Sequence, residues 1–160
     1  MFVSETYELI DAIFKDNATL SDNTNWNTVS SRVTLTRLET YSNLKRKTDA
    51  TTFGEISIPI NVTDFIFEMD LQFESIDGSW VMSFREGSNS KLGLNANSLR
   101  FNNSEWHHLK FECKGLNVNY YLDGVNVTTF TFSGSGVNKF QLEARESNSI
   151  NFKNVVLYPI

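Results

Sequence analysis

Hydrophobic and polar residues alternate along most of the chain, and the clearest case is the segment 64–74. A strand presents successive side chains on opposite faces, so this period of two predicts a strand with one core face and one acidic face. The inward set is Phe65, Phe67, Met69, Leu71 and Phe73, and the outward set is Asp64, Glu68, Asp70, Gln72 and Glu74, with Ile66 as the exception.

The same alternation predicts further strands, separated by short stretches rich in Asn, Ser and Gly. Asp123-Gly124 is the strongest turn signal, because both central residues of a type I′ turn need positive φ. In the segment 79–86, Trp80 is expected to face the core, whereas Ser83 and Arg85 face outward. The remaining strands are expected at about 32–40, 53–60, 91–95, 99–101, 105–113, 117–122, 125–132, 138–146 and 150–158.

The first part of the chain fits the pattern less well. Residues 7–14 fit one face of a short helix, or a strand that ends at Phe14-Lys15-Asp16, and the β-rich remainder favours the strand. Lys45-Arg46-Lys47 is interpreted as a solvated turn. About ten short strands with turn signals every eight to twelve residues predict an all-β fold, as a sandwich or a barrel. No linker or repeat divides residues 1–160, so we expect one domain, least well defined over residues 1–30.

Composition and charge argue against several classes of function. The net charge of −5 argues against a nucleic-acid partner, which needs a basic face. No apolar run is long enough to span a membrane, and the start of the chain lacks the apolar run of a signal peptide. Cys113 is the single cysteine of the chain, so it has no partner for an internal disulfide. It falls on the same strand face as Leu109 and Phe111, which predicts a buried thiol.

A resemblance to a known family begins at Trp106. The segment Glu105-Trp106-His107-His108-Leu109-Lys110-Phe111, followed by Leu122-Asp123-Gly124-Val125, resembles the hairpin of laminin-G-like and pentraxin-like domains. Residues 150–158 resemble the last strand of the same group, the concanavalin A-like lectin and glucanase superfamily. The resemblance implies a two-sheet antiparallel jelly-roll sandwich. Because that fold serves lectins, glucanases, lyases, adhesion modules and viral tail proteins, it implies no particular ligand.

Carboxylates on one strand are the feature that would suggest an enzyme. Glu68, Asp70 and Glu74 share a face, and glycosidases use two carboxylates flanking the scissile bond. The resemblance implies a tighter spacing, however, with an acid where Gln72 stands. Neighbouring His107 and His108 point to opposite strand faces and make a poor metal site. The sequence therefore predicts no catalytic residues, no metal ligands and no enzyme.

A polar stripe favours binding instead. Lys139, Gln141, Glu143 and Arg145 alternate with apolar residues, and Arg85 takes the outward face of its own strand. If these strands neighbour the acidic strand, one polar surface results, which binds a saccharide or forms a lattice of salt bridges. Trp26 is the candidate stacking platform, although it is also compatible with a loop Trp folded under the sandwich. The predicted carbohydrate-binding residues are Arg85, Arg145, Glu143, Gln141, Glu68, Asp70 and Trp26.

We therefore expect a non-catalytic carbohydrate-binding or receptor-binding module of a larger cell-surface or viral tail protein. The alternative is a structural or protein-interaction domain of a surface or virion assembly, and glycoside hydrolysis is the least favoured option. The expected partners are a glycan or glycosylated surface and protein neighbours, without nucleic acid or membrane insertion, in an extracellular, cell-surface or virion setting. No cofactor is predicted, although calcium at Asp22-Asn23 or Asp123 stays open.

Overall fold

The computed structural model describes residues 12–22, 24, 26, 28–29, 31–47, 53–76, 79–145 and 149–160. Within these residues the regular elements are strands, which form two sheets. The eight-stranded sheet contains β1 (Phe14–Asp16), β3 (Val33–Arg37), β4 (Ser42–Arg46), β6 (Phe65–Phe73), β9 (His107–Lys114), β10 (Asn117–Leu122), β11 (Val125–Thr131) and β13 (Ser149–Pro159). The five-stranded sheet contains β2 (Thr28–Val29), β5 (Gly54–Pro59), β7 (Trp80–Glu86), β8 (Asn89–Asn95) and β12 (Lys139–Ala144).

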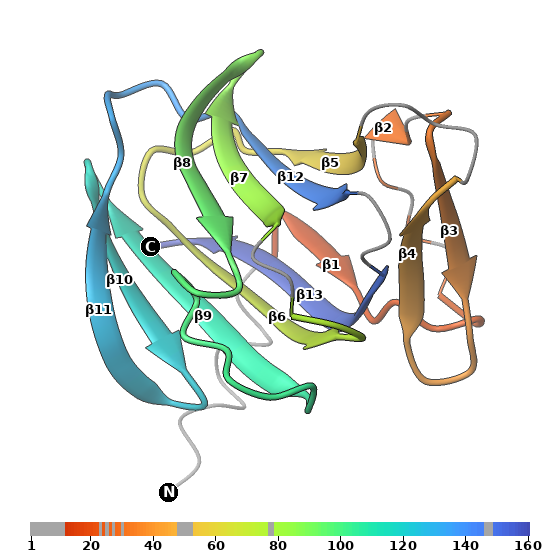
Figure 1. Cartoon of the computed structure of the whole chain (residues 1–160). Coiled ribbons are helices and arrows are strands. Elements are labelled where there is room, and N and C mark those ends of the chain that lie inside the picture. Colours follow the sequence, from red (N-terminus) through yellow and green to blue (C-terminus); the bar gives the residue numbers. More distant parts are fainter. Residues whose placement is uncertain are drawn as a thin grey trace, which may run out of the picture.

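Every pair of neighbouring strands in both sheets is antiparallel, and the order departs strongly from the chain order. The large sheet runs β11-β10-β9-β6-β13-β4-β3, with β1 also paired to β13, and the small sheet runs β2-β5-β12-β7-β8. Figure 1 shows β8, β7 and β12 crossing the upper part of the view and β9, β6 and β13 crossing the lower part. These crossovers between two sheets confirm the predicted two-sheet antiparallel jelly-roll sandwich.

Aromatic side chains fill the space between the sheets. Phe67 on β6 lies 4.2 Å, centroid to centroid, from Phe140 on β12, and Phe84 on β7 makes an edge contact with Phe111 on β9. Burying one Phe stabilises the fold by about 1.5–3 kcal/mol, so these contacts hold the two sheets together. Cys113 is fully buried in the same core, as predicted, and burial raises the pKa of its thiol.

Several local predictions can be compared with the strands. Phe14–Asp16 forms β1, as expected, while residues 1–11 lie outside the described part of the chain. Asp123 and Gly124 have φ values of 50° and 83°, which confirms the predicted turn between β10 and β11. The predicted strand at 99–101 is wrong, because Arg100 adopts a φ of 63° within a turn. The turn expected at Lys45-Arg46 is also wrong, since both residues lie in β4 and pair with β3.

Among the described residues, no helix has the length and apolar character needed to cross a membrane.

Candidate functional site

The outward face of the five-stranded sheet is a polar surface built from three adjacent strands. Register places Lys139 opposite Arg85, Gln141 opposite both Ser83 and Ser57, and Glu143 opposite Glu55. The alternating residues of β12, Phe140 and Leu142, are fully buried in the core. We call the outward set of Glu55, Ser57, Ser83, Arg85, Lys139, Gln141 and Glu143 the polar face.

Glu143 lies at the centre of a hydrogen-bond network on the polar face. Its side chain is almost fully buried, and Arg145 donates to Oε2 from Nε at 3.0 Å and from Nη2 at 2.8 Å. Gln141 donates to Oε1 at 3.0 Å. The Arg145 guanidinium also lies 4.2 Å from the centroid of the Phe53 ring. The network fixes Arg145 and satisfies a buried charge that would otherwise be costly.

Glu55, opposite Glu143 on β5, is less well satisfied. Its Oε2 atom is buried and has no hydrogen-bond partner among the described residues. Two carboxylates that face each other across antiparallel strands have Cβ atoms about 4.5–5.5 Å apart. The polar face therefore contains an acidic pair at its Glu143 end, and Arg145 neutralises one member of that pair.

Trp80 adds an aromatic platform that the sequence did not predict here. The strand register shifts between Trp80 and Met82, so that Val81 and Met82 are both buried and the Trp80 side chain joins the outward face of β7. Trp80 is 47% exposed. The expectation that Trp80 faces the core is therefore wrong, because a β-bulge changes the alternation on one side of the insertion.

Trp80 and the polar face together line a surface hollow of about 280 Å³. The hollow is bounded by Trp80, Met82, Ser83, Arg85, Ser90, Gly93, Glu143 and Arg145. Apolar ring surface beside guanidinium, hydroxyl and carboxylate groups is the combination that a sugar ring requires, with stacking on one side and hydrogen bonds around the rim.

The structure separates the predicted binding residues into three places. Arg85, Gln141, Glu143 and Arg145 come together in or beside this hollow, and whether they bind carbohydrate stays a prediction. Glu68 and Asp70 lie on β6 in the other sheet. The outward faces of two packed sheets point in opposite directions, so the single surface that would have joined these acids to Arg85 and Arg145 does not exist.

Glu68 and Asp70 form a separate cluster around His108 of β9. His108 Nδ1 lies 2.6 Å from Asp70 Oδ1, and its Nε2 lies 3.1 Å from Glu68 Oε1. The hydrogen bonds with Asp70 and then Glu68 raise the pKa of His108 to about 9. Burial works to raise the pKa of both carboxyls, but hydrogen bonds from His108 and from Tyr158 or Asn154 outweigh it and hold each pKa below its usual value. The imidazolium is thus a bridge between two carboxylates.

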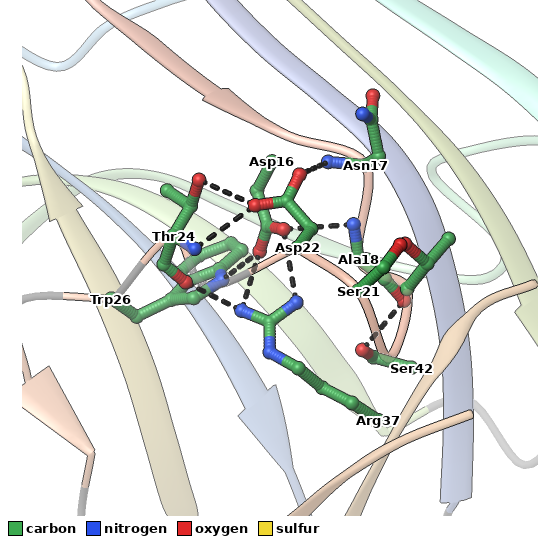
Figure 2. Close-up of polar contacts among 10 residues, drawn as sticks. Asp16, Asn17, Ala18, Ser21, Asp22, Thr24, Trp26, Arg37 and Ser42 are labelled. Atoms are coloured by element: carbon green, nitrogen blue, oxygen red, sulfur yellow. Dashed lines mark hydrogen bonds and ion pairs between the residues drawn. The ribbon is translucent and has the colours of Figure 1, made fainter. Parts of the chain in front are cut away.

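Trp26 is not a stacking platform, and that prediction is wrong. Its side chain is only 5% exposed and makes edge contacts with Phe14 and Phe152. Its indole Nε1 donates to Asp16 Oδ2 at 2.9 Å, and Arg37 donates to both oxygens of the same carboxylate at 2.9 and 3.0 Å (Figure 2). Trp26 is folded under the sandwich because Asp16 satisfies its N–H there. Asn23, Asn25 and Asn27 around it lie outside the described residues.

The sequence leaves calcium binding open at two loops, Asp22-Asn23 and Asp123. At Asp22, Oδ2 accepts from the Asn17 amide, and Oδ1 accepts from the Thr24 amide and hydroxyl (Figure 2). The Thr24 hydroxyl is the main cause of the lowered pKa of Asp22. At Asp123, the carboxylate accepts from the His108 amide and bonds His107. In the part of the chain that the structure describes, no three His, Cys, Asp or Glu side chains are grouped to hold a metal ion. Calcium binding stays an untested prediction.

Comparison with known proteins establishes the fold. No protein-family model and no curated protein sequence matches the chain. Among solved structures, a sialidase superposes with a TM-score of 0.65 at 12% identity over 81% of this chain, which spans only 16% of the sialidase. Domain 4 of AbnA, an extracellular arabinanase from Geobacillus stearothermophilus solved with arabinotriose, superposes with a TM-score of 0.59 at 14% identity, over 90% of this chain and 88% of that one.

A third structure concerns catalysis. The β-glucanase of Bacillus licheniformis has a TM-score of 0.55 at 12% identity, over 92% of this chain and 97% of the glucanase. The chain therefore shares the two-sheet jelly-roll fold of these structures, which is the fold that the sequence resemblance implied. The prediction that it is not an enzyme is overturned, since the same fold, at nearly the same length, belongs to an enzyme and to the arabinanase domain alike. These identities do not establish an activity.

Proposed function

We propose that the chain binds carbohydrate in the hollow beside Trp80 on the polar face. The observation on which the proposal rests is the exposed Trp80 ring beside Arg85, Arg145 and Glu143 around a hollow of about 280 Å³. A sugar ring offers C–H groups on one face, which pack on an indole ring, and hydroxyls at its edge, which pair with guanidinium and carboxylate groups. Arabinotriose in the similar arabinanase domain supports the same class of ligand.

Preorganisation supports the proposal as well. Glu143 holds Arg145 through two hydrogen bonds and Phe53 covers its plane, so little side-chain entropy is lost when a ligand hydroxyl meets that guanidinium. Arg85 is oriented by Ser83 Oγ at 3.3 Å and by the Ser88 carbonyl. A pocket whose polar groups are already fixed favours recognition of one sugar arrangement over others.

The test is a glycan-array screen of the purified chain, run with and without calcium, followed by calorimetry on the best ligand. Trp80→Ala should weaken binding by about tenfold or more, since loss of ring contact costs roughly 1–2 kcal/mol. Tyr121→Ala removes a partly exposed aromatic from the other sheet and is the matched control. Equal loss in both variants, or no binding to any glycan, would refute the proposal.

We further propose that this module is displayed by a larger cell-surface or viral tail protein, where glycan binding serves adhesion in an extracellular setting. We propose protein neighbours at the edge of the large sheet, where β11 is the last strand. Val125 and Val127 on this strand are 63% and 36% exposed. Exposed β-branched residues on an edge strand favour pairing with another strand. If light scattering shows a dimer or trimer that Val127→Lys dissociates, the structural role gains support; a monomer at all concentrations argues against it.

Hydrolysis of the bound glycan is a second candidate function, favoured by the opposed Glu55 and Glu143. Retaining glycosidases need two carboxyl groups about 5–5.5 Å apart, which neighbouring antiparallel strands can supply. Release of reducing ends from array-positive glycans, abolished in Glu55→Gln and kept in Glu112→Gln of the other sheet, would support it. Ligand binding without any release would leave the chain as a binding module.

A further inference from the structure

We propose that the polar face selects acidic glycans, and that Arg85 and Lys139 together hold a carboxylate of the ligand. The inference rests on the proposed function and names the substrate class of that same site. It arises from an unusual pairing: Arg85 on β7 and Lys139 on β12 are directly opposed in register, both on the outward face. Like charges directly opposite each other on a sheet are destabilising, with Cβ atoms about 4.5–5.5 Å apart.

Neither cation is neutralised by the chain in the described residues. Arg85 donates to two neutral oxygens, the Ser83 hydroxyl and the Ser88 carbonyl. Where the structure describes this sheet, its ion pairs use other cations: Arg145 pairs with Glu143, and Lys91 pairs with Glu86. A protein of net charge −5 therefore places two uncompensated positive charges opposite each other on neighbouring strands, and one of them, Arg85, lines the proposed site.

An anion between the two side chains converts their repulsion into attraction. A guanidinium matches a carboxylate in a bidentate geometry, and an ammonium on the opposite side adds a further charge-assisted hydrogen bond. Arg85 lines the same hollow as Trp80, so a sugar ring stacked on the indole can direct a ring carboxylate toward the cations.

The two ends of the polar face also differ in charge, which would orient the ligand. The Glu143 end holds the opposed acids Glu55 and Glu143 with Arg145, whereas the Arg85 end holds two cations. At the Glu143 end the two acids outnumber Arg145, so a carboxylate there meets a net negative charge, whereas at the Arg85 end it meets two cations. An acidic sugar therefore has one favoured orientation: its carboxylate lies near Arg85 and Lys139, and its hydroxyl groups lie near Glu143 and Arg145.

The experiment is calorimetry on the full chain with three matched trisaccharides: a galacturonic acid trimer, the neutral galactose trimer and a sulfated galactose trimer. The galacturonic acid trimer should bind at least about tenfold more tightly than the neutral one, as expected for charge-assisted hydrogen bonds. Raising the salt from 20 mM to 500 mM should erase most of that preference, because the cations lie at the surface. The sulfated trimer distinguishes a carboxylate site from a general anion site.

Variants assign the effect to the cation pair. Arg85→Gln and Lys139→Gln should each lower the acid-to-neutral preference by about tenfold, whereas Lys45→Gln, which removes an exposed charge from the other sheet, should not change it. Equal affinity for the acidic and neutral trimers overturns this inference and leaves the proposed function intact. Tighter binding of the sulfated trimer overturns the carboxylate assignment. Failure of the glycan array as a whole overturns both.

Discussion

The indole ring of Trp80 lies directly against Gly93 of the neighbouring strand: a β-carbon on Gly93 would come within 3.4 Å of both Cε3 and Cζ3 of the ring. Glycine at this position leaves room for the ring to lie over β8 instead of standing away from the sheet. A β-carbon at position 93 would therefore just reach van der Waals contact with the ring, and a larger side chain would press on it.

Gly93→Val should therefore weaken glycan binding without unfolding the protein. Because a β-carbon already reaches the ring, the γ-methyl groups of valine should crowd the indole and displace Trp80 from the hollow, and we expect about a tenfold loss of affinity. Calorimetry measures the affinity, and tryptophan emission reports the change around Trp80. Thr129→Val introduces a valine at an exposed position of β11, in the other sheet and far from the hollow, and should leave binding unchanged. Unchanged binding by Gly93→Val would show that the ring is not the platform.

The buried carboxylate of Asp16 should be a major determinant of stability. It is fully buried and receives four hydrogen bonds, from Arg37, Trp26 and the Ala18 amide. Asp16→Asn leaves the Arg37 guanidinium, whose side chain is 19% exposed, without its counter-charge. Removing one partner of a buried ion pair costs about 3–5 kcal/mol, so the midpoint of urea unfolding should fall markedly.

A surface ion pair provides the comparison for Asp16. Glu86 and Lys91 lie 3.1 Å apart, but the Glu86 side chain is half exposed. Glu86→Gln should change the free energy of unfolding by less than about 1 kcal/mol. Equal losses in the Asp16 and Glu86 variants would mean that the Asp16 cluster does not hold the folded state together.

Stability should also fall as the pH rises through the pKa of His108. The folded-state pKa is raised from 6.5 to about 9, so the stabilisation is complete below 6.5 and is lost progressively up to about 9. Glu68 and Asp70 act in the opposite sense, because their lowered pKa values give stability that is lost as the pH falls below their usual range. The His108 ring is nearly half exposed, so solvent screening limits the effect to about 1 kcal/mol.

Urea unfolding at pH 6, 7.5 and 9 measures this dependence. His108→Gln should flatten the change between pH 6.5 and 9, whereas Val125→Ala at the exposed edge should keep it. An NMR titration of the His108 ring provides a direct value. A pKa near 6.5 would mean that the bridge to Glu68 and Asp70 does not form in solution.

Strands with a strict period were predictable from the sequence. Phe65, Phe67 and Met69 are buried on β6 as their spacing required, because each strand must place one face on the core. The turn at Asp123-Gly124 was predictable from the local requirement for positive φ. Both are local properties of the chain, and neither depends on which strands become neighbours.

The candidate site depends on which strands pair with each other, and the alternation of residues within one strand does not reveal that pairing. Alternation assigns Glu68 and Arg85 each to the outward face of a strand, but it does not say that β6 and β7 belong to different sheets. Similarly, nothing in residues 79–86 marks the bulge that turns Trp80 outward, since a bulge is defined by its pairing with β8. The order of the strands therefore had to come from the structure.

The sequence suggested Trp26 as the sugar platform and Trp80 as a core residue, and we expect the opposite: Trp26 should stabilise the fold and Trp80 should bind the ligand. Trp26→Phe keeps a ring against Phe14 and Phe152 but removes the N–H that donates to Asp16. Loss of one hydrogen-bond donor to the buried Asp16 carboxylate should lower the free energy of unfolding by about 1–3 kcal/mol, so the midpoint of urea unfolding should fall. Glycan affinity should stay within about twofold of that of the unmodified chain.

Trp80→Phe tests the opposite case. Its ring is about half exposed and packs on Gly93 at the surface, so the smaller ring should reduce affinity severalfold with a stability change below about 1 kcal/mol. Measuring both variants by urea unfolding and by calorimetry gives a two-by-two comparison. A Trp26 variant that loses binding at unchanged stability would restore Trp26 as the platform and remove the hollow on the five-stranded sheet from consideration. Loss of stability in Trp26→Phe together with loss of affinity in Trp80→Phe would assign the core role and the binding role to separate tryptophans.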